Sequence, residues 1–246
     1  MPIVAADLIA YEALNRVDDD TALAGGGIDV DHRIVFTQLA ANDSLEALST
    51  SASDTQVITV VGRNAAGAKT TNSVAMTGVT AVAIPGGVHE RVLRCSVPLD
   101  VVGTVTLRRA AAGPTVGTIP PAERGFHGAF VDSASEAAIA IRYHKIFWRN
   151  SHATLTLNAA TVKLTADPDA RIRIGVAAAK GDTVTIANRK TAPAAITFVD
   201  DNVAQNVPGT TLEAVTAIGV WVEQNLPASD TPHRVTYTTE LAGTTI

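Results

Sequence analysis

Short stretches of alternating or uniformly apolar residues, each ended by turn-forming residues, recur along the chain. Residues 56–61 (QVITVV) are mostly apolar and rich in β-branched side chains, and residues 69–76 alternate between polar and apolar side chains. Between them lies the loop 64–67 (NAAG), in which Asn64 suits the opening of a turn and Gly67 its close. β-Branched residues favour strands, and Asn and Gly favour tight turns. This part of the sequence therefore predicts a β-hairpin.

Further strands are predicted at regular intervals on both sides of this hairpin. Before residue 110 they are 33–39, 44–49, 79–84, 90–97 and 104–108. After residue 122 they are 137–148, 154–157, 161–165, 171–176, 184–187, 195–199, 217–223 and 234–241. Short strands with turn residues between them, and no ten-residue helical pattern after any strand, indicate a sandwich or barrel rather than a β-α-β fold.

The fold class predicted from these patterns is all-β, with two β-sandwich or jelly-roll-like domains and an extended N-terminal arm. Residues 110–122 (AAAGPTVGTIPPA) combine Ala, Gly and three prolines without hydrophobic periodicity. This composition is typical of a semi-extended linker. We therefore expect an arm and flexible loop at residues 1–30, a first β domain at 31–109, a linker at 110–122 and a second β domain at 123–246.

The first 17 residues are compatible with two structures. Leu8, Tyr11 and Leu14 recur near helical spacing, whereas an extended arm would use its apolar side chains to contact a neighbouring molecule. We favour the arm, whose predicted partner-binding residues are Ile3, Val4, Leu8, Ile9 and Tyr11.

Three consecutive aspartates, Asp18 to Asp20, follow this segment and precede three glycines, Gly25 to Gly27. Carboxylates and glycines together occur in calcium loops, but the EF-hand requires acidic residues at alternate positions and a Glu at the twelfth. The spacing here instead predicts a solvated, flexible loop without a metal.

Composition narrows the range of functions. The formal net charge is −5 with no block of basic residues, which argues against nucleic-acid binding. Charged residues make up 17% of the chain, below the roughly 25% of an average soluble domain. This deficit suggests that part of the surface is covered by other protein. Cys95 is the only cysteine and is expected to be a buried small side chain. No stretch predicts a membrane span or a secretory signal, so we expect folding in a cytoplasm.

Motifs for catalysis, cofactors or metals are not found in the sequence. The six histidines (His32, His89, His127, His144, His152 and His233) are scattered rather than paired at metal-ligand spacing. Asp200 and Asp201 are adjacent, and neighbouring strand residues point to opposite faces, so a turn is the simpler interpretation. Trp148 and Trp221 are expected to be core anchors rather than ligand platforms. We therefore predict no catalytic, cofactor-binding or metal-binding residues.

Four stretches of the sequence resemble virion structural proteins of tailed bacteriophages. They are MPIVAADLIAYEALNRVDDDTALAGGGID, SASDTQVITVVGRNAAGAKTTNSVAMTG, ATLTLNAATVKLTADP and AIGVWVEQNLPA. The resemblance implies a non-enzymatic component of the virion, assembled in the host cytoplasm. The leading hypothesis is a capsid decoration or cement protein, a homo-oligomer with a trimer favoured, that binds the major capsid protein or other virion proteins. The alternatives are a tail, neck or baseplate component, and a carbohydrate-binding or hydrolytic β protein.

Overall fold

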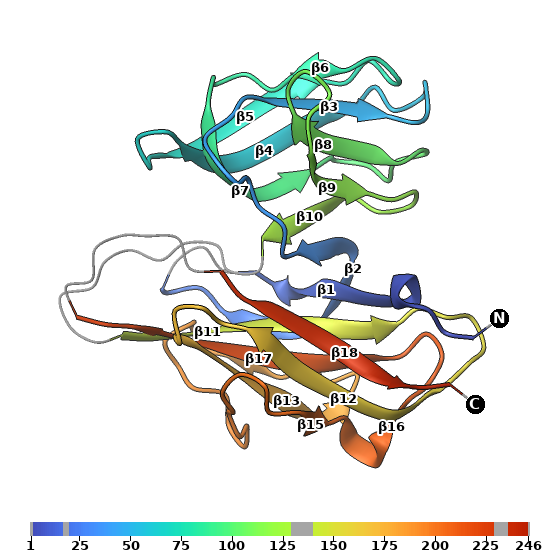
Figure 1. Cartoon of the computed structure of the whole chain (residues 1–246), viewed down its shortest axis with the longest axis vertical. Helices are drawn as coiled ribbons and strands as arrows, with labels where there is room; N and C mark the ends of the chain where they lie inside the picture. The colour runs from blue at the N-terminus through green and yellow to red at the C-terminus, as the bar shows by residue number, and fades with distance from the viewer. Residues whose placement is uncertain (1, 17–19, 129–139, 229–235, 246) are drawn as a thin grey trace. The chain divides into compact units, whose positions relative to one another are not determined.

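The computed structural model is all-β and describes residues 2–16, 20–128, 140–228 and 236–245. The chain divides into two compact units, both drawn in Figure 1. Unit 1 comprises Met1–Asp29 and Asp132–Ile246, and unit 2 comprises Val30–Val131. The strand β2 contributes its first residues to unit 1 and its last residues to unit 2. The sequence-based prediction of an all-β chain is therefore confirmed.

Unit 1 is built from strands on both sides of unit 2 in the sequence. Its elements are η1 (Ala5–Asp7), β1 (Leu8–Asn15), the start of β2 (Ala24–Val35), β11 (Ala140–Asn150), β12 (Leu157–Ala166), β13 (Ile172–Lys180), β14 (Thr185–Ile186), β15 (Gln205–Asn206), η2 (Pro208–Thr210), β16 (Thr211–Leu212), β17 (Ala217–Leu226) and β18 (Thr238–Thr244).

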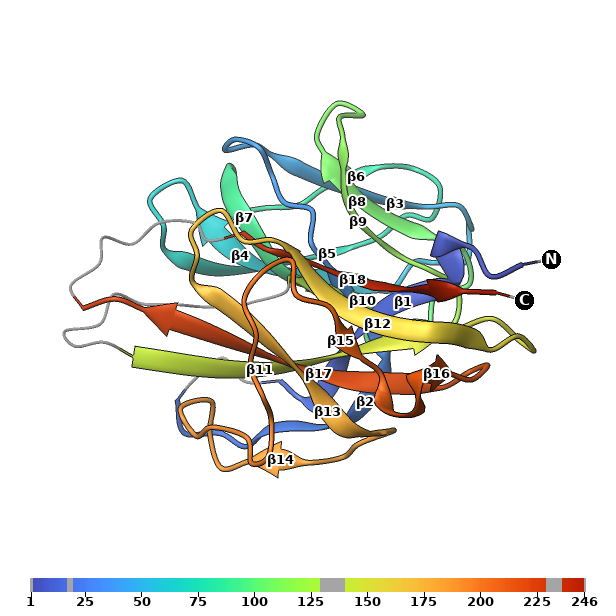
Figure 2. The ribbon, with the colours of Figure 1, turned by 60° about the horizontal axis from the view of Figure 1, so that its bottom comes forward.

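Two sheets make up unit 1. The first has the order β13-β17-β11-β1-β2, with β14 paired to the start of β2. The second consists of β12 with β15, β16 and β18, and Figure 2 shows β12 running alongside β18. The alternation predicted in the β13 segment is confirmed, because Ile172 and Ile174 are buried and Arg173 is exposed.

The first sheet of unit 1 is buried at its centre on both faces, as the nearly uninterrupted burial of β17 indicates. Trp221 of this strand is fully buried and packs in a cluster with Tyr143 and Ile186, against which Ile196 and Phe198 also pack. The segment after β13 therefore covers one face of the sheet. The prediction that Trp221 anchors a core is confirmed.

Unit 2 contains the remaining strands. They are the end of β2, β3 (Leu45–Ser49), β4 (Val57–Asn64), β5 (Lys69–Ala75), β6 (Val82–Ala83), β7 (His89–Ser96), β8 (Val105–Arg109), β9 (Thr115–Ile119) and β10 (Gly125–Gly128). One sheet has the order β2-β10-β7-β4-β5 and the other the order β6-β3-β8-β9. The hairpin predicted around residues 64–67 is confirmed, since β4 and β5 pair in continuous register from Val57↔Ala75 to Arg63↔Lys69.

The two sheets of unit 2 enclose one apolar cluster. It draws Val60 and Cys95 from one sheet and Leu45, Leu107 and Ile119 from the other. Cys95 is completely buried, as predicted, and burial raises the pKa of its thiol. The unit is thus a sandwich whose interior is filled mainly by aliphatic side chains.

The domain boundary predicted at residues 110–122 differs from the structure. This segment contains β9, which pairs with β8 inside unit 2 and buries Val116 and Ile119. The units instead meet along the chain near residues 29–30 and 131–132. Proline and glycine mark an edge strand here rather than a linker, because prolines are tolerated where a strand begins or ends.

The N-terminal segment also differs from the extended arm that we predicted. Residues 8–15 form β1, which pairs antiparallel with β11 from Leu8↔Asn150 to Glu12↔Ile146. Tyr11 and Ala13 are buried in unit 1, so the segment packs on its own unit from residue 8 onward. A strand meets the backbone hydrogen-bonding needs of these residues, which a detached arm would leave to water.

The glycine stretch predicted to be a flexible loop is the beginning of β2. Gly25 and Gly26 have φ of 88° and 92°, and a Cβ on Gly25 would lie 2.7 Å from the Trp221 ring. Glycine is required there by both the backbone angle and the close packing.

Asp20 is held by cations rather than solvated. It pairs with Arg142 (2.9 Å), Arg189 (2.6 Å) and Lys190 (2.7 Å). Partial burial would raise the pKa of Asp20, but hydrogen bonds from Lys190 and Arg189 and the charge of Arg142 outweigh this and lower it to about 2. Asp18 and Asp19 lie outside the described residues.

Candidate protein-binding surface

The predicted partner-binding residues do not form one exposed face. Val4 is 53% exposed, whereas Ile3, Leu8 and Ile9 are half-buried and Tyr11 is buried. Tyr11 and Ile9 pack with Phe147 on one side of β1, within unit 1 itself. Among the predicted residues, Val4 and Leu8 therefore remain the candidates for contact with a partner.

A tight turn fixes Val4 in place. The Val4 N–H donates to Oδ2 of Asp7 (2.9 Å), and the Asp7 N–H donates to the Val4 carbonyl (2.9 Å). The Asp7 carbonyl accepts a bond from the Ser151 N–H (2.7 Å), which joins the turn to the chain beyond β11. These reciprocal bonds satisfy the backbone groups at the start of η1 and hold the segment before β1 in one conformation.

A hollow of about 370 Å³, named here the Trp148 hollow, includes Ala5 of this turn in its lining. Leu8 and Trp148 contribute from the first sheet of unit 1, and residues of β12 and β18 contribute from the second. Its lining residues are Ala5, Leu8, Trp148, Thr165, Thr238, Thr239, Glu240 and Leu241. The Trp148 Nε1–H donates to Oγ1 of Thr239 (3.1 Å) and so ties the two sheets together at the hollow.

Trp148 is therefore only partly a core residue. It is half-buried, unlike Trp221, and presents part of its indole to the hollow. The sequence showed an aromatic residue at the end of a long apolar strand, but β18, which forms the opposite wall, lies almost a hundred residues away. Only the pairing of the strands reveals the hollow.

A second hollow of about 280 Å³, the His152 hollow, includes Val4 and Asp7 of the turn in its lining. It is lined by Pro2, Val4, Asp7, Ser151, His152 and Ala153. Nδ1 of His152 accepts bonds from the N–H groups of Thr154 (3.2 Å) and Leu155 (3.1 Å). These two bonds hold the loop that follows β11 against the His152 ring.

The surface around both hollows is mainly apolar and carries two carboxylates. Asp7 is engaged in the turn, whereas Glu240 is exposed and forms no ion pair within the described residues. A small apolar hollow of this size suits one or two anchoring side chains of a protein partner. The free carboxylate favours a partner with a basic residue beside its apolar anchor.

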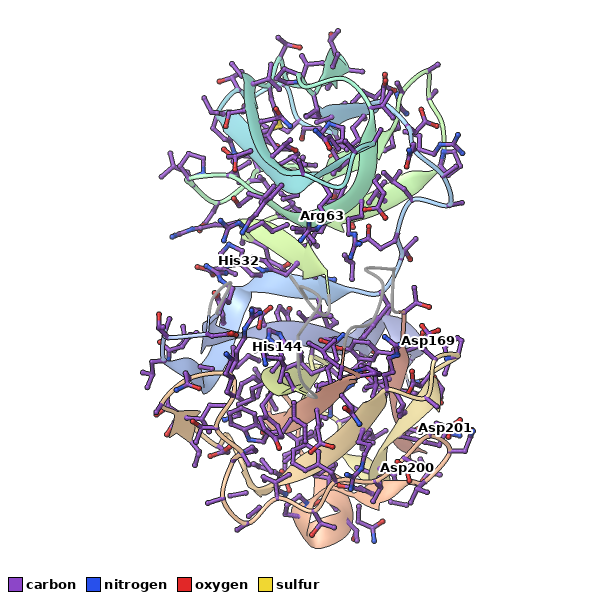
Figure 3. The ribbon with its side chains drawn as sticks, turned by 90° about the vertical axis from the view of Figure 1, so that its left-hand side faces the viewer. His32, Arg63, His144, Asp169, Asp200 and Asp201 are labelled. Carbon is purple, nitrogen blue, oxygen red and sulfur yellow. The ribbon has the colours of Figure 1, made fainter. Side chains whose placement is uncertain are left out.

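Glu12 and His144 are buried polar residues of unit 1 that lie close to each other. Oε1 of Glu12 accepts a bond from the Ala13 N–H (2.9 Å) and lies 3.0 Å from Nε2 of His144, whose place within unit 1 is marked in Figure 3. Burial, and to a smaller extent the charge of Glu12, raise the pKa of Tyr237 well above its usual value. Neither Glu12 nor His144 lines a hollow described above, so this pair has no route to a substrate there.

The adjacent aspartates considered in the sequence do not form a carboxylate pair in a groove. Figure 3 shows Asp200 and Asp201 at the outside of unit 1, near Asp169. Asp200 lies 3.5 Å from Arg173, and Asp201 accepts a bond from Asn202 (2.8 Å). This supports the interpretation of a turn.

Metal ligands and membrane spans were sought in the part of the chain that the structure describes. No group of three or more His, Cys, Asp or Glu side chains there could hold a metal ion. Within the same residues, no helix is both long enough and apolar enough to cross a bilayer. His233 lies outside the described residues.

Comparisons of the chain with models of protein families, with curated proteins and with solved structures found no match.

Proposed function

We propose that this chain is a non-enzymatic structural protein of a tailed-bacteriophage virion, which decorates the head by binding the lattice of the major capsid protein. The proposal is motivated by the four stretches of sequence that resemble virion proteins. The observation that carries the binding mode is the rigid turn at Val4, whose residues contribute to the lining of two mainly apolar hollows. A preformed, rigid anchor point reduces the entropy lost on binding.

The exposed apolar residues support a protein partner over a carbohydrate. Within the described residues, the large exposed hydrophobic side chains are all Val, Leu or Ile. Carbohydrate-binding sites would be expected to present exposed aromatic rings, whereas the indole of Trp148 is half-buried and its Nε1–H is already bonded to Thr239. Aliphatic side chains and shallow hollows instead suit contacts with another protein surface.

Labelling of purified phage particles with antibodies against this chain tests the location. Labelling over the head surface is expected. Labelling confined to the tail, neck or baseplate would replace the decoration role with the alternative structural one. Particles that carry none of the chain would refute the virion proposal.

Two valines of equal exposure test the binding surface. Val4 and Val215 both lie in unit 1 and are both 53% exposed, but of the two only Val4 lines the Trp148 or the His152 hollow. Val4→Asp is expected to abolish co-sedimentation with heads that lack the protein, and Val215→Asp is expected to preserve it. If both variants lose co-sedimentation equally, or if neither loses it, the contact with the head lies elsewhere on the protein.

A further inference from the structure

β5 is the outermost strand of its sheet in unit 2. Its one strand partner is β4, and the side of β5 away from β4 is open in the strand order. Along β5, Thr70, Asn72 and Val74 are half-buried, and the residues between them are exposed. The strand can be followed in Figure 1.

The hydrogen bonds of the β4–β5 hairpin show which backbone groups of β5 bond to β4 and which point away from it. The Asn64 N–H donates to the Ala68 carbonyl (2.9 Å), and the Met76 N–H donates to the Gln56 carbonyl (3.1 Å). In an antiparallel pair such bonds recur at every second residue. The even-numbered residues of β5 therefore bond to β4, and the odd-numbered residues point their N–H and C=O groups outward.

Thr71, Ser73 and Ala75 thus present a free row of donors and acceptors. Within the described residues, their outward backbone groups have no hydrogen-bond partner. Their side chains are short, exposed and uncharged. An edge of this kind is a template for pairing with another strand.

Other long edge strands in the molecule are protected against such pairing. β9 lies between Pro114 and Pro120 and has a bulge opposite β8. β18 pairs with β12 through two register shifts and carries the charged Glu240. Bulges, prolines and charges are the usual devices that prevent edge pairing.

β13 is protected in a different way. Its ladder with β17 is interrupted after Val176, and its outer side pairs with Val199 at Ile174. By contrast, the register of β5 is unbroken over its whole length, it contains no proline, and its one charge is Lys69 at its first position. The molecule therefore leaves β5 open where it closes its other long edges.

We propose that β5 pairs antiparallel with β5 of a second copy of this chain about a two-fold axis at Ser73. Ser73 of one copy then lies opposite Ser73 of the other, and Thr71 lies opposite Ala75. This register pairs all three free residues in both copies. The two units 2 thereby form one continuous sheet across the dimer.

A second copy fits this edge for electrostatic reasons. The residues that face each other are small and neutral, so identical edges do not repel. The antiparallel direction places the two Lys69 side chains at opposite ends of the ladder, on the order of 27 Å apart. A low charged fraction of 17% is also expected of a chain that covers part of its surface by self-association. The proposed dimer does not depend on the proposed role of the protein on the phage head.

Substitutions at Ser73 test the dimer in the full-length protein. Sedimentation equilibrium over a wide range of concentration is expected to show a monomer–dimer equilibrium. Ser73→Lys places two ammonium groups directly opposite each other and should weaken dimerisation on the order of ten-fold or more. Ser73→Ala keeps the backbone N–H and should leave it unchanged. A monomer at every concentration, or equal dimerisation of the Lys variant, overturns the proposal.

Cysteine cross-linking tests the register. Cys95 is completely buried and does not compete for an oxidant. Ser73→Cys should form a disulfide between two copies, because directly opposite residues in a hydrogen-bonded pair have Cα atoms about 5.5 Å apart. Thr71→Cys is the matched control, since its two copies would lie on the order of 13 Å apart. Failure of the Ser73 variant to cross-link, or equal cross-linking of both variants, refutes the two-fold at Ser73.

Discussion

The central strands of the two units bury different kinds of side chain. In unit 1, β11 buries Arg142, His144 and Lys145. In unit 2, β7 buries Val92, Leu93 and Cys95, with His89 at its start as the exception. Two sandwiches of one chain thus use two ways of filling the middle of a sheet.

This difference determines what each unit requires in order to fold. A buried ammonium is tolerated only when specific partners surround it, so the centre of unit 1 depends on directional contacts. An aliphatic interior depends mainly on total volume and tolerates repacking. We therefore expect unit 1 to be sensitive to the loss of single polar partners, and unit 2 to the loss of buried volume.

The aromatic residues allow the two units to be followed separately. Trp148, Trp221 and the three tyrosines (Tyr11, Tyr143 and Tyr237) all lie in unit 1. Intrinsic fluorescence therefore reports on unit 1, and hydrogen exchange of peptides from residues 45–109 reports on unit 2.

Removal of the buried ammonium of Lys145 should cause the largest loss of stability. Nζ of this fully buried side chain pairs with Asp182 (2.7 Å), donates to the carbonyls of Gly26 and Val184, and lies 5.3 Å from the Trp221 ring. Burial lowers the pKa of Lys145, and the pair with Asp182 opposes the shift. Lys145→Met would remove the cation that pairs with the largely buried Asp182 carboxylate, and the carbonyls of Gly26 and Val184 would lose this donor. We expect a loss of about 3–5 kcal/mol in the free energy of unfolding by tryptophan fluorescence.

Lys180 provides the control for that experiment. It pairs with Glu213 at the same distance of 2.7 Å, but both side chains are partly exposed to solvent. Lys180→Met should cost about 0–1 kcal/mol. Similar losses in the two variants would show that burial does not make the Lys145 pair more important for stability than an exposed pair of the same unit.

A substitution that creates a cavity in the interior of unit 2 should cause the next largest loss of stability. Leu107 is completely buried in the aliphatic cluster between the sheets. Leu107→Ala is expected to cost about 2–5 kcal/mol and to accelerate hydrogen exchange in residues 45–109. Val102→Ala, a truncation at an exposed residue of the same unit, should change stability by less than about 0.5 kcal/mol. A small effect of Leu107→Ala would contradict the idea that unit 2 depends on packed volume.

Asp54 is a polar exception within unit 2. Its carboxylate accepts bonds from the Ser49 hydroxyl (2.5 Å) and from the N–H groups of Val102 (2.8 Å) and Gly103 (2.9 Å). Burial alone would raise the pKa of Asp54, but these hydrogen bonds outweigh it and lower the pKa below 3.8. Asp54→Asn is expected to cost about 1–3 kcal/mol at neutral pH.

The pH dependence of this effect follows from the direction of the shift. A carboxyl whose pKa is lowered in the folded state stabilises fully above the unfolded pKa and less as the pH falls through the folded pKa. The difference between wild type and Asp54→Asn should therefore shrink below pH 3.8. Asp100→Asn, at an exposed site, serves as the control. A difference that stays constant into acid would contradict the assigned role of the carboxylate.

Local patterns predicted the strands and the hairpin because those features depend on neighbouring residues. The alternation around Ile172 and the Asn64 to Gly67 turn are of this kind. The division into units was not predictable in the same way. It depends on β11 pairing with β1 across more than a hundred residues, and no local signal records this.

The candidate binding surface was predictable only in part. Val4 and Leu8 were identified from their apolar character, and both line a hollow. Tyr11 has the same character but is buried, because strand alternation places it on the opposite side of β1 from Leu8. Thr239 and Glu240 carried no signal, since they reach the hollow only through the pairing of β18 with β12.

Titration of His89 should have the smallest effect, and it completes the comparison of the units. Both ring nitrogens are buried and neither makes a hydrogen bond of good geometry. Burial lowers the pKa of His89 below 6.5, and the nearby Pro85 carbonyl only partly opposes this shift. Below pH 6.5 the unfolded chain therefore binds a proton that the folded state does not, and stability falls as the pH decreases. The slope from one such group is at most about 1.4 kcal/mol per pH unit.

His89→Leu removes the titrating group and the two unpaired nitrogens at nearly constant volume. Urea unfolding followed by hydrogen exchange of unit 2 should show that wild type loses stability from pH 7 to pH 5 more steeply than the variant, by up to about 1.4 kcal/mol per pH unit. Near pH 8, where the histidine is neutral in both states, the pH dependence of the two proteins should be the same. Parallel curves across the whole range would mean that the charge on His89 is accommodated in the folded state, and that the interior of unit 2 tolerates a cation as the interior of unit 1 does.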